Sequence, residues 1–261
     1  MAKRQLTDRR ALVTGASSGI GRALAIELAR HGVDLVLLAR REDRLAEVAK
    51  EVSAHGRRAV TIAGDVTDPA VRRRALNAAR QELGGLDILV NNAGVAAHGR
   101  FADADPGRIR PIFEVNFFAP VELIREAIPV LREGVRPIVV NIGSILGERG
   151  APHKSEYSAS KFALHGFSEA VRPELNRLGI DVLVVAVGPT ETEHFDVLLE
   201  GTAELPWGDP PRQPAEQVAR AVVRAIECGR HKVATSWRAR MLLLANRLFP
   251  RIVDRIMARF G

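Results

Sequence analysis

Cysteine is nearly absent from this chain: Cys228 is the only one among 261 residues. An intrachain disulfide is therefore excluded, and the composition fits a reducing compartment. The longest uninterrupted apolar runs, such as residues 182–187, have the length of a strand and are too short to span a bilayer as a helix. The first ten residues are polar and basic, so no secretory signal is recognisable. We expect a cytoplasmic protein.

Excess charge of one sign is also scarce, except at the C-terminus. The net charge is +7, and residues 237–261 contain six arginines and a single aspartate, which leaves the rest of the chain close to neutral. Outside residues 237–261, basic residues are mixed with acidic ones. This part of the chain lacks the concentrated basic face and the matching motif that nucleic-acid binding requires. We therefore expect no nucleic-acid partner.

Strand-like and helix-like segments alternate along the chain, and 46% of the residues are hydrophobic. Strands are predicted at 10–14, 33–39, 59–63, 86–90, 137–142, 180–187 and 231–235, and helices at 19–31, 42–55, 68–83, 106–132, 155–178 and 214–229. Apolar strands separated by helices indicate a parallel sheet covered on both faces. The prediction is an α/β fold: one doubly wound, Rossmann-type sheet of about seven strands within residues 1–236.

A glycine-rich turn follows the first predicted strand. Glycines at 15, 19 and 21 surround Ser17, Ser18 and Ile20 and lead directly into a helix. Glycines allow a sharp turn and close approach to a pyrophosphate, and the helix N-terminus offers free N–H donors. The turn predicts a dinucleotide site, although a glycine-rich connection without a ligand is the alternative.

The second predicted strand ends at Arg40 and Arg41, and no acid occurs before Glu42. A site for NAD usually has a carboxylate at this place for the ribose 2′-hydroxyl, whereas arginine suits a 2′-phosphate. We expect NADP(H) rather than NAD(H), with Arg40 as the main contact and Arg41 as a second one. The alternative is that both arginines are solvated surface groups.

Three side chains suited to carbonyl chemistry occur near the end of the fifth predicted strand. Tyr157, the only tyrosine, lies four residues before Lys161 on a predicted helix, so the two share a face. The ammonium would lower the pKa of the phenol and favour proton exchange near neutral pH. Ser144 follows a strand, at the edge where such sheets bind ligands. Asn116 lies inside the predicted helix 106–132.

Taken together, these elements resemble the short-chain dehydrogenase/reductase family in its form of about 250 residues. The matching elements follow the family's order: T-G-A-S-S-G-I-G at 14–21, Asp65-Val66, N-N-A-G at 91–94, Asn116, Ser144, and Y-S-A-S-K at 157–161. The resemblance implies an oxidoreductase that transfers a hydride between a nicotinamide cofactor and a carbonyl or alcohol. It also implies a homo-oligomer, a dimer or tetramer, built through helices 106–132 and 155–178.

The resemblance assigns a role to each catalytic residue. Tyr157 is the general acid/base, Lys161 lowers its pKa and binds the nicotinamide ribose, and Ser144 orients the carbonyl. Asn116 holds a water in a proton relay to Lys161. No metal site is predicted.

The resemblance also implies cofactor contacts beyond the glycine-rich turn. Asp65 binds the adenine ring and Val66 packs beside it, while Asn92, Ala93 and Gly94 line the cofactor. The family usually has P-G-x-x-x-T after the sixth strand, but this chain has Val187 in place of the first proline. Gly188 and Thr192 still match, and with Thr190 they are expected beside the nicotinamide.

Residues 190–213 are expected to form a loop over the substrate. Its apolar residues indicate an apolar ketone or aldehyde, unless they pack on the body of the protein and say nothing of the substrate: Phe195, Leu198, Leu199, Leu205 and Trp207.

Residues 237–261 are expected to form a basic amphipathic helical extension of the same domain, in which Pro250 starts a second helix or kinks a single one. The extension could pack on its own domain, cover the substrate site, join a partner subunit, or lie on an anionic membrane surface.

Two other functions remain open on the sequence. One is a membrane-surface reductase of lipid- or steroid-like carbonyls, and the other is a non-catalytic redox sensor that binds the dinucleotide.

Overall fold

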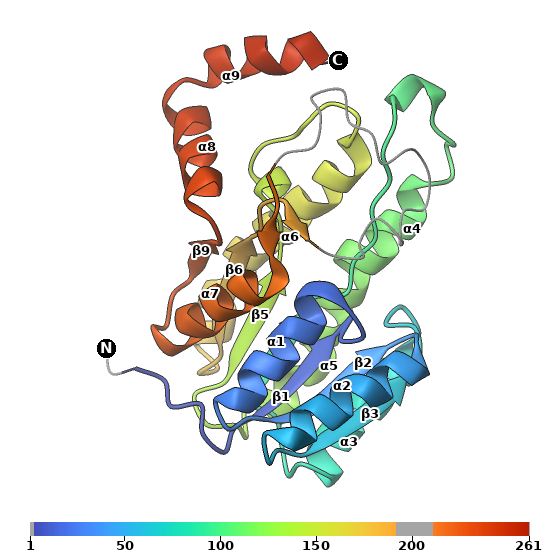
Figure 1. Ribbon diagram of the computed structural model, residues 1–261, viewed down its shortest axis with the longest axis vertical. Coiled ribbons are helices and arrows are strands. Elements are labelled where there is room, and N and C mark those ends of the chain that lie inside the picture. Colours follow the sequence, from blue (N-terminus) through green and yellow to red (C-terminus); the bar gives the residue numbers. More distant parts are fainter. Residues whose placement is uncertain (1–2, 192–210, 261) are drawn as a thin grey trace.

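A computed structural model describes residues 3–191 and 211–260 of the chain. Its centre is a parallel sheet of seven strands in the order β3-β2-β1-β4-β5-β6-β9. The strands are β1 (Arg10–Thr14), β2 (Asp34–Ala39), β3 (Ala59–Ala63), β4 (Ile88–Asn91), β5 (Ile138–Ile142), β6 (Asp181–Ala186) and β9 (Lys232–Ala234). The predicted doubly wound sheet is confirmed (Figure 1).

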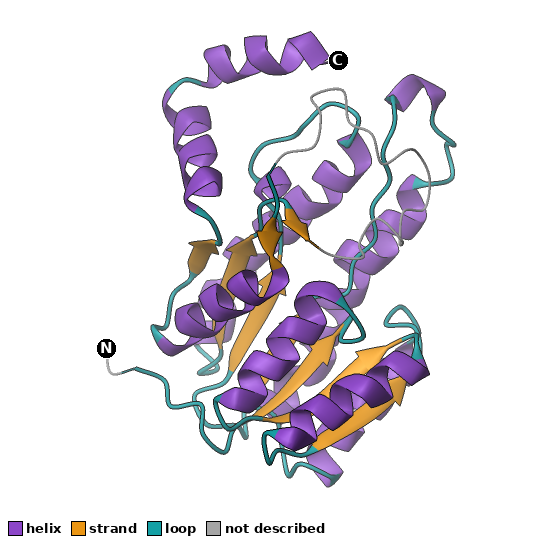
Figure 2. Cartoon of the chain, in the orientation of Figure 1, coloured by secondary structure: helices purple, strands orange, loops and turns teal. Residues whose placement is uncertain are grey.

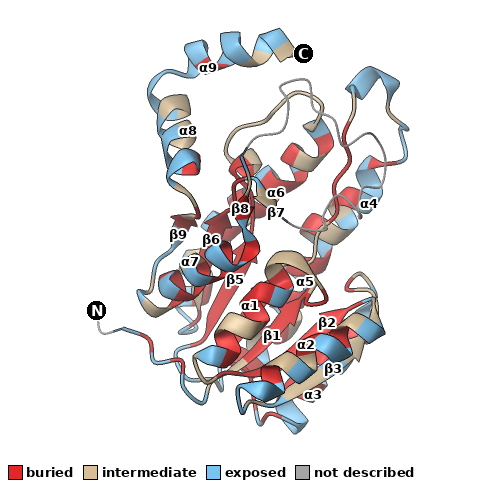
Figure 3. Cartoon of the chain, in the orientation of Figure 1, coloured by how far each residue is buried: buried red, intermediate tan, exposed pale blue. Residues whose placement is uncertain are grey.

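Two hydrophobic cores lie on opposite faces of this sheet, because successive side chains of each strand point to opposite sides. Helices α1 (Gly19–Arg30), α2 (Glu42–Ala54) and α7 (Ala215–Glu227) pack on one face, with buried residues such as Leu28 and Val222. Helices α3 (Pro69–Gln81), α5 (Ala119–Leu131) and α6 (Ser155–Asn176) cover the other face. Figure 2 shows the helices on both sides of the strands, and Figure 3 shows the burial of the sheet.

The strand order reverses between β1 and β4. The first three strands extend to one side and the later ones to the other, so the connections diverge at the carboxyl ends of β1 and β4. Doubly wound sheets bind their ligands in the crevice at this point.

The predicted helical stretch 106–132 is confirmed as one continuous run from Ile109 to Leu131, but it contains a π-helical turn that was not predicted. The structure has α4 (Ile109–Phe113), a π-helical turn at Glu114–Phe118, and then α5. The N–H of Ala119 donates to the carbonyl of Glu114, five residues back, and Pro120 has no N–H to donate. The wider turn contains Asn116, and hydrophobic periodicity did not reveal it.

The ends of the predicted substrate loop are held together by a small two-stranded sheet. Strand β7 (Thr190–Glu191) pairs in parallel with β8 (Gln213–Pro214). The apolar residues predicted to form the lid (195, 198, 199, 205 and 207) lie outside the described residues.

The C-terminal extension consists of α8 (Trp237–Leu248), α9 (Pro250–Met257) and a final 3-10 turn, Ala258–Phe260. The chain turns at Phe249, and Pro250 occupies the first turn of α9, so Pro250 starts a second helix rather than kinking one. In Figure 1, α8 leaves the end of β9 and α9 runs across its far end. Among the described residues, no helix combines the length and the apolar character needed to cross a membrane.

Candidate active site at the carboxyl edge of the sheet

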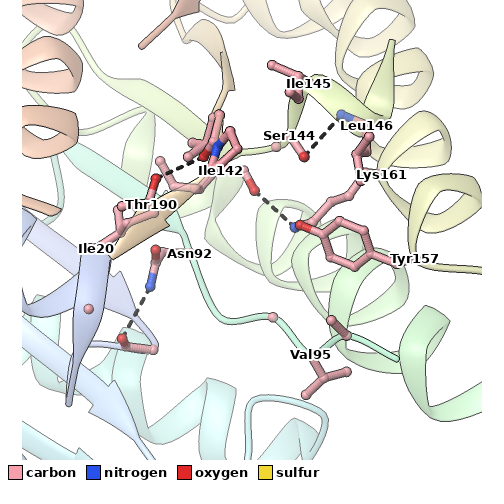
Figure 4. A pocket seen from close by; sticks show the side chains of 18 of the residues that line it. Ile20, Asn92, Val95, Ile142, Ser144, Ile145, Leu146, Tyr157, Lys161 and Thr190 are labelled. Carbon is pink, nitrogen blue, oxygen red and sulfur yellow. Dashed lines mark hydrogen bonds between the residues drawn. The ribbon is translucent and has the colours of Figure 1, made fainter. Parts of the chain in front are cut away.

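A cavity of about 1000 Å³ opens at the carboxyl ends of the strands. Its walls come from the glycine-rich turn, the ends of β2 and β4, the segment after β5, the first half of α6, and the C-terminal extension. Figure 4 shows Ile20, Asn92, Ser144, Tyr157, Lys161 and Thr190 at this cavity. Most of the site residues predicted from the sequence line it: Gly15, Ser17, Ser18, Gly19, Ile20, Arg40, Arg41, Asp65, Val66, Asn92, Ala93, Gly94, Ser144, Tyr157, Lys161, Gly188 and Thr190. Gly21 and Asn116 lie behind the wall, and Thr192 is outside the described residues.

The glycine-rich turn is too tightly packed for side chains at two positions. Gly15 has φ +64°, and a Cβ there would lie 2.8 Å from Asn92 Nδ2. A Cβ on Gly21 would lie only 2.2 Å from the carbonyl oxygen of Gly15. Asn92 Nδ2 donates to the carbonyls of Thr14 and Gly15 at 2.9 and 3.2 Å, which ties the turn to the end of β4. Asn92 therefore supports the turn as well as lining the cavity.

The N-terminus of α1 faces this turn without a side-chain cap. Ser18 is its N-cap residue, but the Ser18 hydroxyl accepts a hydrogen bond from Arg41 Nη2 at 2.6 Å and none from the helix. The first N–H groups of α1 thus have no side-chain acceptor, which suits a phosphate. These features fit a dinucleotide.

Arg41 rather than Arg40 is the arginine in contact with the turn. Its guanidinium lies 3.3 Å from Ser17 Oγ, in addition to its bond to Ser18. Arg40 is exposed and lines the cavity from the end of β2. Both arginines therefore border the place where a dinucleotide ribose would lie in this fold.

Asp65 and Val66 follow β3 at the same end of the cavity. The Asp65 carboxylate accepts hydrogen bonds from the backbone N–H and hydroxyl of Thr67 at 2.9 and 2.8 Å, which hold the loop in shape. Val66 is buried.

Tyr157, Ser144 and Lys161 meet on one wall of the cavity (Figure 4). The Tyr157 and Ser144 side chains are hydrogen-bonded to each other, and Ser144 Oγ accepts the N–H of Leu146 at 3.1 Å. Lys161 Nζ lies 5.8 Å from the centre of the Tyr157 ring and donates to the carbonyl of Ile142 at 3.1 Å. The i, i+4 spacing on α6 thus brings the phenol and the ammonium side by side.

Burial is the main influence on the pKa values of Tyr157 and Lys161. Burial raises the pKa of the Tyr157 hydroxyl, and the hydrogen bond with Ser144 opposes this. Burial lowers the pKa of Lys161 to about 8. Burial is thus the larger of the two influences on the pKa of Tyr157, and the expectation that Lys161 lowers this pKa stays a prediction.

The Asn116 side chain is fully engaged with protein groups. Its Oδ1 accepts the N–H of Val95 at 2.9 Å, and its Nδ2 donates to the Val95 carbonyl and to Ser160 Oγ at 2.9 and 3.0 Å. An ideal Cβ on Gly94 would lie 3.2 Å from Asn116 Oδ1 and 3.7 Å from Lys161 Nζ. The π-helical turn thus fastens the segment after β4 against the start of α6.

Two buried polar contacts hold the segments around the site together. Asn91, the first residue of the N-N-A-G motif, donates from Nδ2 to Asn141 Oδ1, and the Asn141 amide donates to Ser168 Oγ, each at 2.8 Å. Arg108 forms a buried, two-pronged ion pair with Glu156, beside Tyr157, at 2.9 and 3.0 Å. The partners of Asn91 and the Arg108–Glu156 pair come from distant segments, so no local motif indicates them.

Lys154 also lines the cavity, one helical turn before Tyr157. Burial, followed by the charge of Arg212, lowers the pKa of Lys154 to about 8. Lys154 lies between Ser144 and Tyr157 in the sequence, where no motif indicated it.

Beyond β6, Val187 takes the place of the proline usual in the family. Val187 is buried in the core, and its carbonyl accepts the N–H of Ile145 at 2.9 Å. Thr190 Oγ1 donates to the Gly188 carbonyl at 2.9 Å and lies 3.3 Å from Gln213 Nε2. Gly188 and Thr190 therefore stay on the cavity wall despite the substitution.

The extension supplies the remaining wall. Trp237, Arg238, Leu242, Met257 and Phe260 line the cavity, so the extension covers part of the site. The sequence left four positions open for the extension. The structure shows that the extension packs on its own domain and lines the cavity. Within residues 3–191 and 211–260, no cluster of three or more His, Cys, Asp or Glu side chains is arranged to hold a metal ion.

The short chain dehydrogenase family model matches residues 9–202. A ketoacyl reductase, HetN of Nostoc, is 33% identical over 98% of this chain and 90% of that protein. A short-chain dehydrogenase from Burkholderia cenocepacia, solved in complex with NADP, aligns with a TM-score of 0.83 and 26% identity over 97% of this chain and 99% of that one.

A Burkholderia phymatum enzyme of the same kind, in complex with NAD, aligns with a TM-score of 0.86 and 23% identity over 95% of this chain and 96% of that one. This second structure supports the fold alone. Together with the matched family model, these comparisons establish that the chain belongs to the short-chain dehydrogenase/reductase family of oxidoreductases.

Proposed function

We propose that this protein transfers a hydride between NADP(H) and a carbonyl or alcohol, with Tyr157 as the general acid/base. The observation that carries the proposal is the wall on which Tyr157 is hydrogen-bonded to Ser144 and lies beside Lys161. A binding-only protein has no use for a matched acid, hydrogen-bond donor and cation in one cavity.

When bound, the reduced nicotinamide supplies a hydride to the carbonyl carbon. Ser144 holds the carbonyl oxygen, and the Tyr157 hydroxyl donates the proton that turns this oxygen into an alcohol. The raised pKa of Tyr157 keeps the phenol protonated and ready to donate. The Lys161 ammonium stabilises the phenolate that remains, and it binds the nicotinamide ribose. In alcohol oxidation the same groups act in reverse.

The Tyr157 phenolate must regain a proton after each reduction. Lys161, with its pKa lowered to about 8, exchanges protons readily near neutral pH. We propose that Asn116 takes part in the relay to Lys161 through its main chain, because its side chain already bonds Val95 and Ser160. Pro120 cannot donate to the Asn116 carbonyl, which favours a water at that oxygen.

The NADP(H) preference rests on the two arginines after β2. Arg41 lies against Ser17 and Ser18, and Arg40 lies exposed on the cavity rim. A guanidinium beside two hydroxyls suits a 2′-phosphate, whereas the place of an acid that would select NAD is taken by Arg40. Asp65, Val66, Asn92, Ala93, Gly94, Gly188, Thr190 and Thr192 are proposed to complete the contacts.

The substrate is proposed to be an apolar ketone or aldehyde. The cavity is lined in part by apolar side chains from the segment after β5, from α8 and from α9: Ile145, Leu146, Ala151, Leu242 and Met257. The relative HetN is named as a ketoacyl reductase, whose name implies a substrate with an acyl chain. A reductase of lipid- or steroid-like carbonyls at a membrane surface is the second candidate, favoured by the exposed apolar residues of the extension.

We also propose a homo-oligomer, a dimer or tetramer, in the cytoplasm. Phe118 at the π-helical turn and Phe162 on α6 are each 44% exposed, on the elements through which the family usually assembles. The single Cys228 is exposed and free, which suits a reducing compartment.

The test is Tyr157→Phe, assayed with NADPH on a panel of apolar ketones and aldehydes. The variant should lose turnover by about 10²–10⁴-fold, the usual contribution of a general acid, while its NADPH affinity, measured by fluorescence titration, stays close to that of the parent protein. Near-normal turnover in the variant would refute the mechanism. Tight NADPH binding without turnover of any carbonyl by the parent protein would favour the redox sensor instead.

A further inference from the structure

The C-terminal extension exposes a row of large apolar side chains. On α8, Trp237, Met241, Leu244 and Leu248 recur at helical spacing along one face, and 48–69% of each side chain is exposed. The side chains of Phe249, just before α9, and of Ile252 and Ile256 on α9 are also exposed. Seven of the thirteen exposed large hydrophobic residues in the described chain thus lie within 237–256. A patch of this kind marks an interaction site.

Exposed arginines alternate with the apolar residues along the extension. Arg247, Arg251, Arg255 and Arg259 recur every fourth residue and are all exposed. The sole acid of the extension, Asp254, is bound to Arg149 after β5 at 2.6 Å, so its charge is neutralised within the protein. The outer surface of the extension is therefore apolar and strongly cationic.

The positive charge continues at the base of α8. Arg220 and Arg224 of α7, Arg230 before β9 and Arg240 of α8 line a hollow of about 540 Å³. None of these four arginines forms an ion pair with a carboxylate of the described residues. The cationic surface is thus larger than the extension itself.

We propose that this surface binds the face of an anionic lipid bilayer. A helix with apolar side chains bordered by arginines can lie in the plane of the membrane–water interface. Its apolar side chains then reach the acyl chains, and its arginines lie among the anionic head groups. A second copy of this chain fits less well, since a symmetric contact would bring two cationic extensions together.

Binding in this way would place the cavity beside the lipid. Trp237, Arg238, Leu242, Met257 and Phe260 of the same extension form one cavity wall. A carbonyl compound dissolved in the bilayer would then have a short path to Tyr157. This consequence rests on the proposed function, whereas the membrane contact itself does not.

The first experiment is flotation of the full chain with vesicles of phosphatidylcholine, with or without phosphatidylglycerol. Binding is expected only with phosphatidylglycerol and should weaken as salt is raised, because screening reduces the attraction. The double substitution Ile252→Asp and Ile256→Asp should abolish binding. Val135→Asp, at an exposed apolar residue before β5, is the matched control and should bind like the parent protein.

A second variant changes charge without touching the apolar row. Replacing Arg251, Arg255 and Arg259 by Gln should weaken vesicle binding on the order of 100-fold, since three cations near an anionic surface are lost. Replacing Arg73, Arg125 and Arg132 by Gln removes the same charge from exposed positions of α3 and α5 and should have little effect. Thermal unfolding of each variant verifies that it is folded.

Failure of the parent protein to bind phosphatidylglycerol vesicles would overturn the proposal. Normal vesicle binding by the double aspartate variant would also overturn it. A double aspartate variant that still binds vesicles but no longer forms an oligomer would show that a second copy of the chain occupies this surface. The readout needs no turnover, and Tyr157→Phe should bind vesicles like the parent protein, so loss of the membrane contact and loss of the proposed reaction are distinguishable.

Discussion

The glycine-rich turn and the C-terminal extension both border the same cavity, but very different interactions hold them. The turn is surrounded by backbone: Asn92 ties it to β4, and a Cβ on Gly21 would collide with the Gly15 carbonyl. The extension contacts the body through the buried Ala239 and Val253 and the exposed Arg149–Asp254 ion pair. We infer that the cofactor half of the site is rigid and the substrate half adaptable.

The largest effect is expected from breaking the rigid half. Gly21→Ala places a Cβ 2.2 Å from a backbone oxygen that cannot move aside. The turn should distort, with a loss of about 1–3 kcal/mol in the free energy of unfolding and the loss of measurable NADPH binding. Gly166→Ala is the control, because nothing lies within 4 Å of that Cβ in α6. It should stabilise the protein by about 0.5–1 kcal/mol, and equal losses in both variants would contradict the argument.

The next effect concerns proton supply at Lys161. A lysine with its pKa near 8 is charged below that pH and neutral above it. The kcat/KM for carbonyl reduction should therefore be flat below about pH 8 and fall about tenfold per pH unit above it. Lys161→Arg stays charged throughout, so its lower activity should not show this decline. A pH profile that is the same in both proteins would remove Lys161 from this role.

A smaller effect is expected at the rim of the turn. Arg41→Ala removes the guanidinium that contacts Ser17 and Ser18. NADPH binding should weaken about 10- to 100-fold, as for the loss of a hydrogen bond to a charged group, while NADH binding changes little. Fluorescence titration with both cofactors measures this, with the exposed Lys50→Ala on α2 as the control. Equal losses for NADPH and NADH would remove the argument for NADP(H) preference.

The smallest effect is expected in the adaptable half. Asp254→Asn breaks the ion pair with Arg149, in which the aspartate is 61% exposed. Exposed pairs contribute at most about 1 kcal/mol, so the melting temperature should change little. The KM for the carbonyl substrate should rise up to about fivefold, and the KM for NADPH should stay constant. A parallel rise of both KM values would show that the two halves are coupled.

The regular elements of the fold were predictable because their signal is local. Strands such as β2 and β5 are buried along their whole length and are almost entirely apolar in the sequence, with only Asp34 and Asn141 as polar residues. The turn at Gly15 and the pair Tyr157 and Lys161 were equally visible, since fixed spacing on one element places such residues together. These signals were sufficient for the architecture and for most of the cavity wall.

The π-helical turn inside the predicted helical stretch 106–132 was not predictable, and the reason is non-local. The π-helical turn around Asn116 is stabilised by bonds to Val95 and Ser160, which come from distant parts of the chain. The spacing of apolar residues in the sequence does not indicate such distant partners. The ion pair between Arg108 and Glu156 was hidden for the same reason.

The sequence by itself determined the family and the sheet and predicted the reactive groups, because each depends on local patterns of apolarity, glycine and residue spacing. Only the tertiary structure decided how those groups are tuned: burial raises the pKa of Tyr157 and lowers that of Lys161. It alone also decided that α8 and α9 line one side of the cavity with Leu242 and Met257 while leaving Leu244 and Ile252 exposed to solvent. Both outcomes depend on which distant segments exclude water from a given side chain, and that is a property of the packed chain.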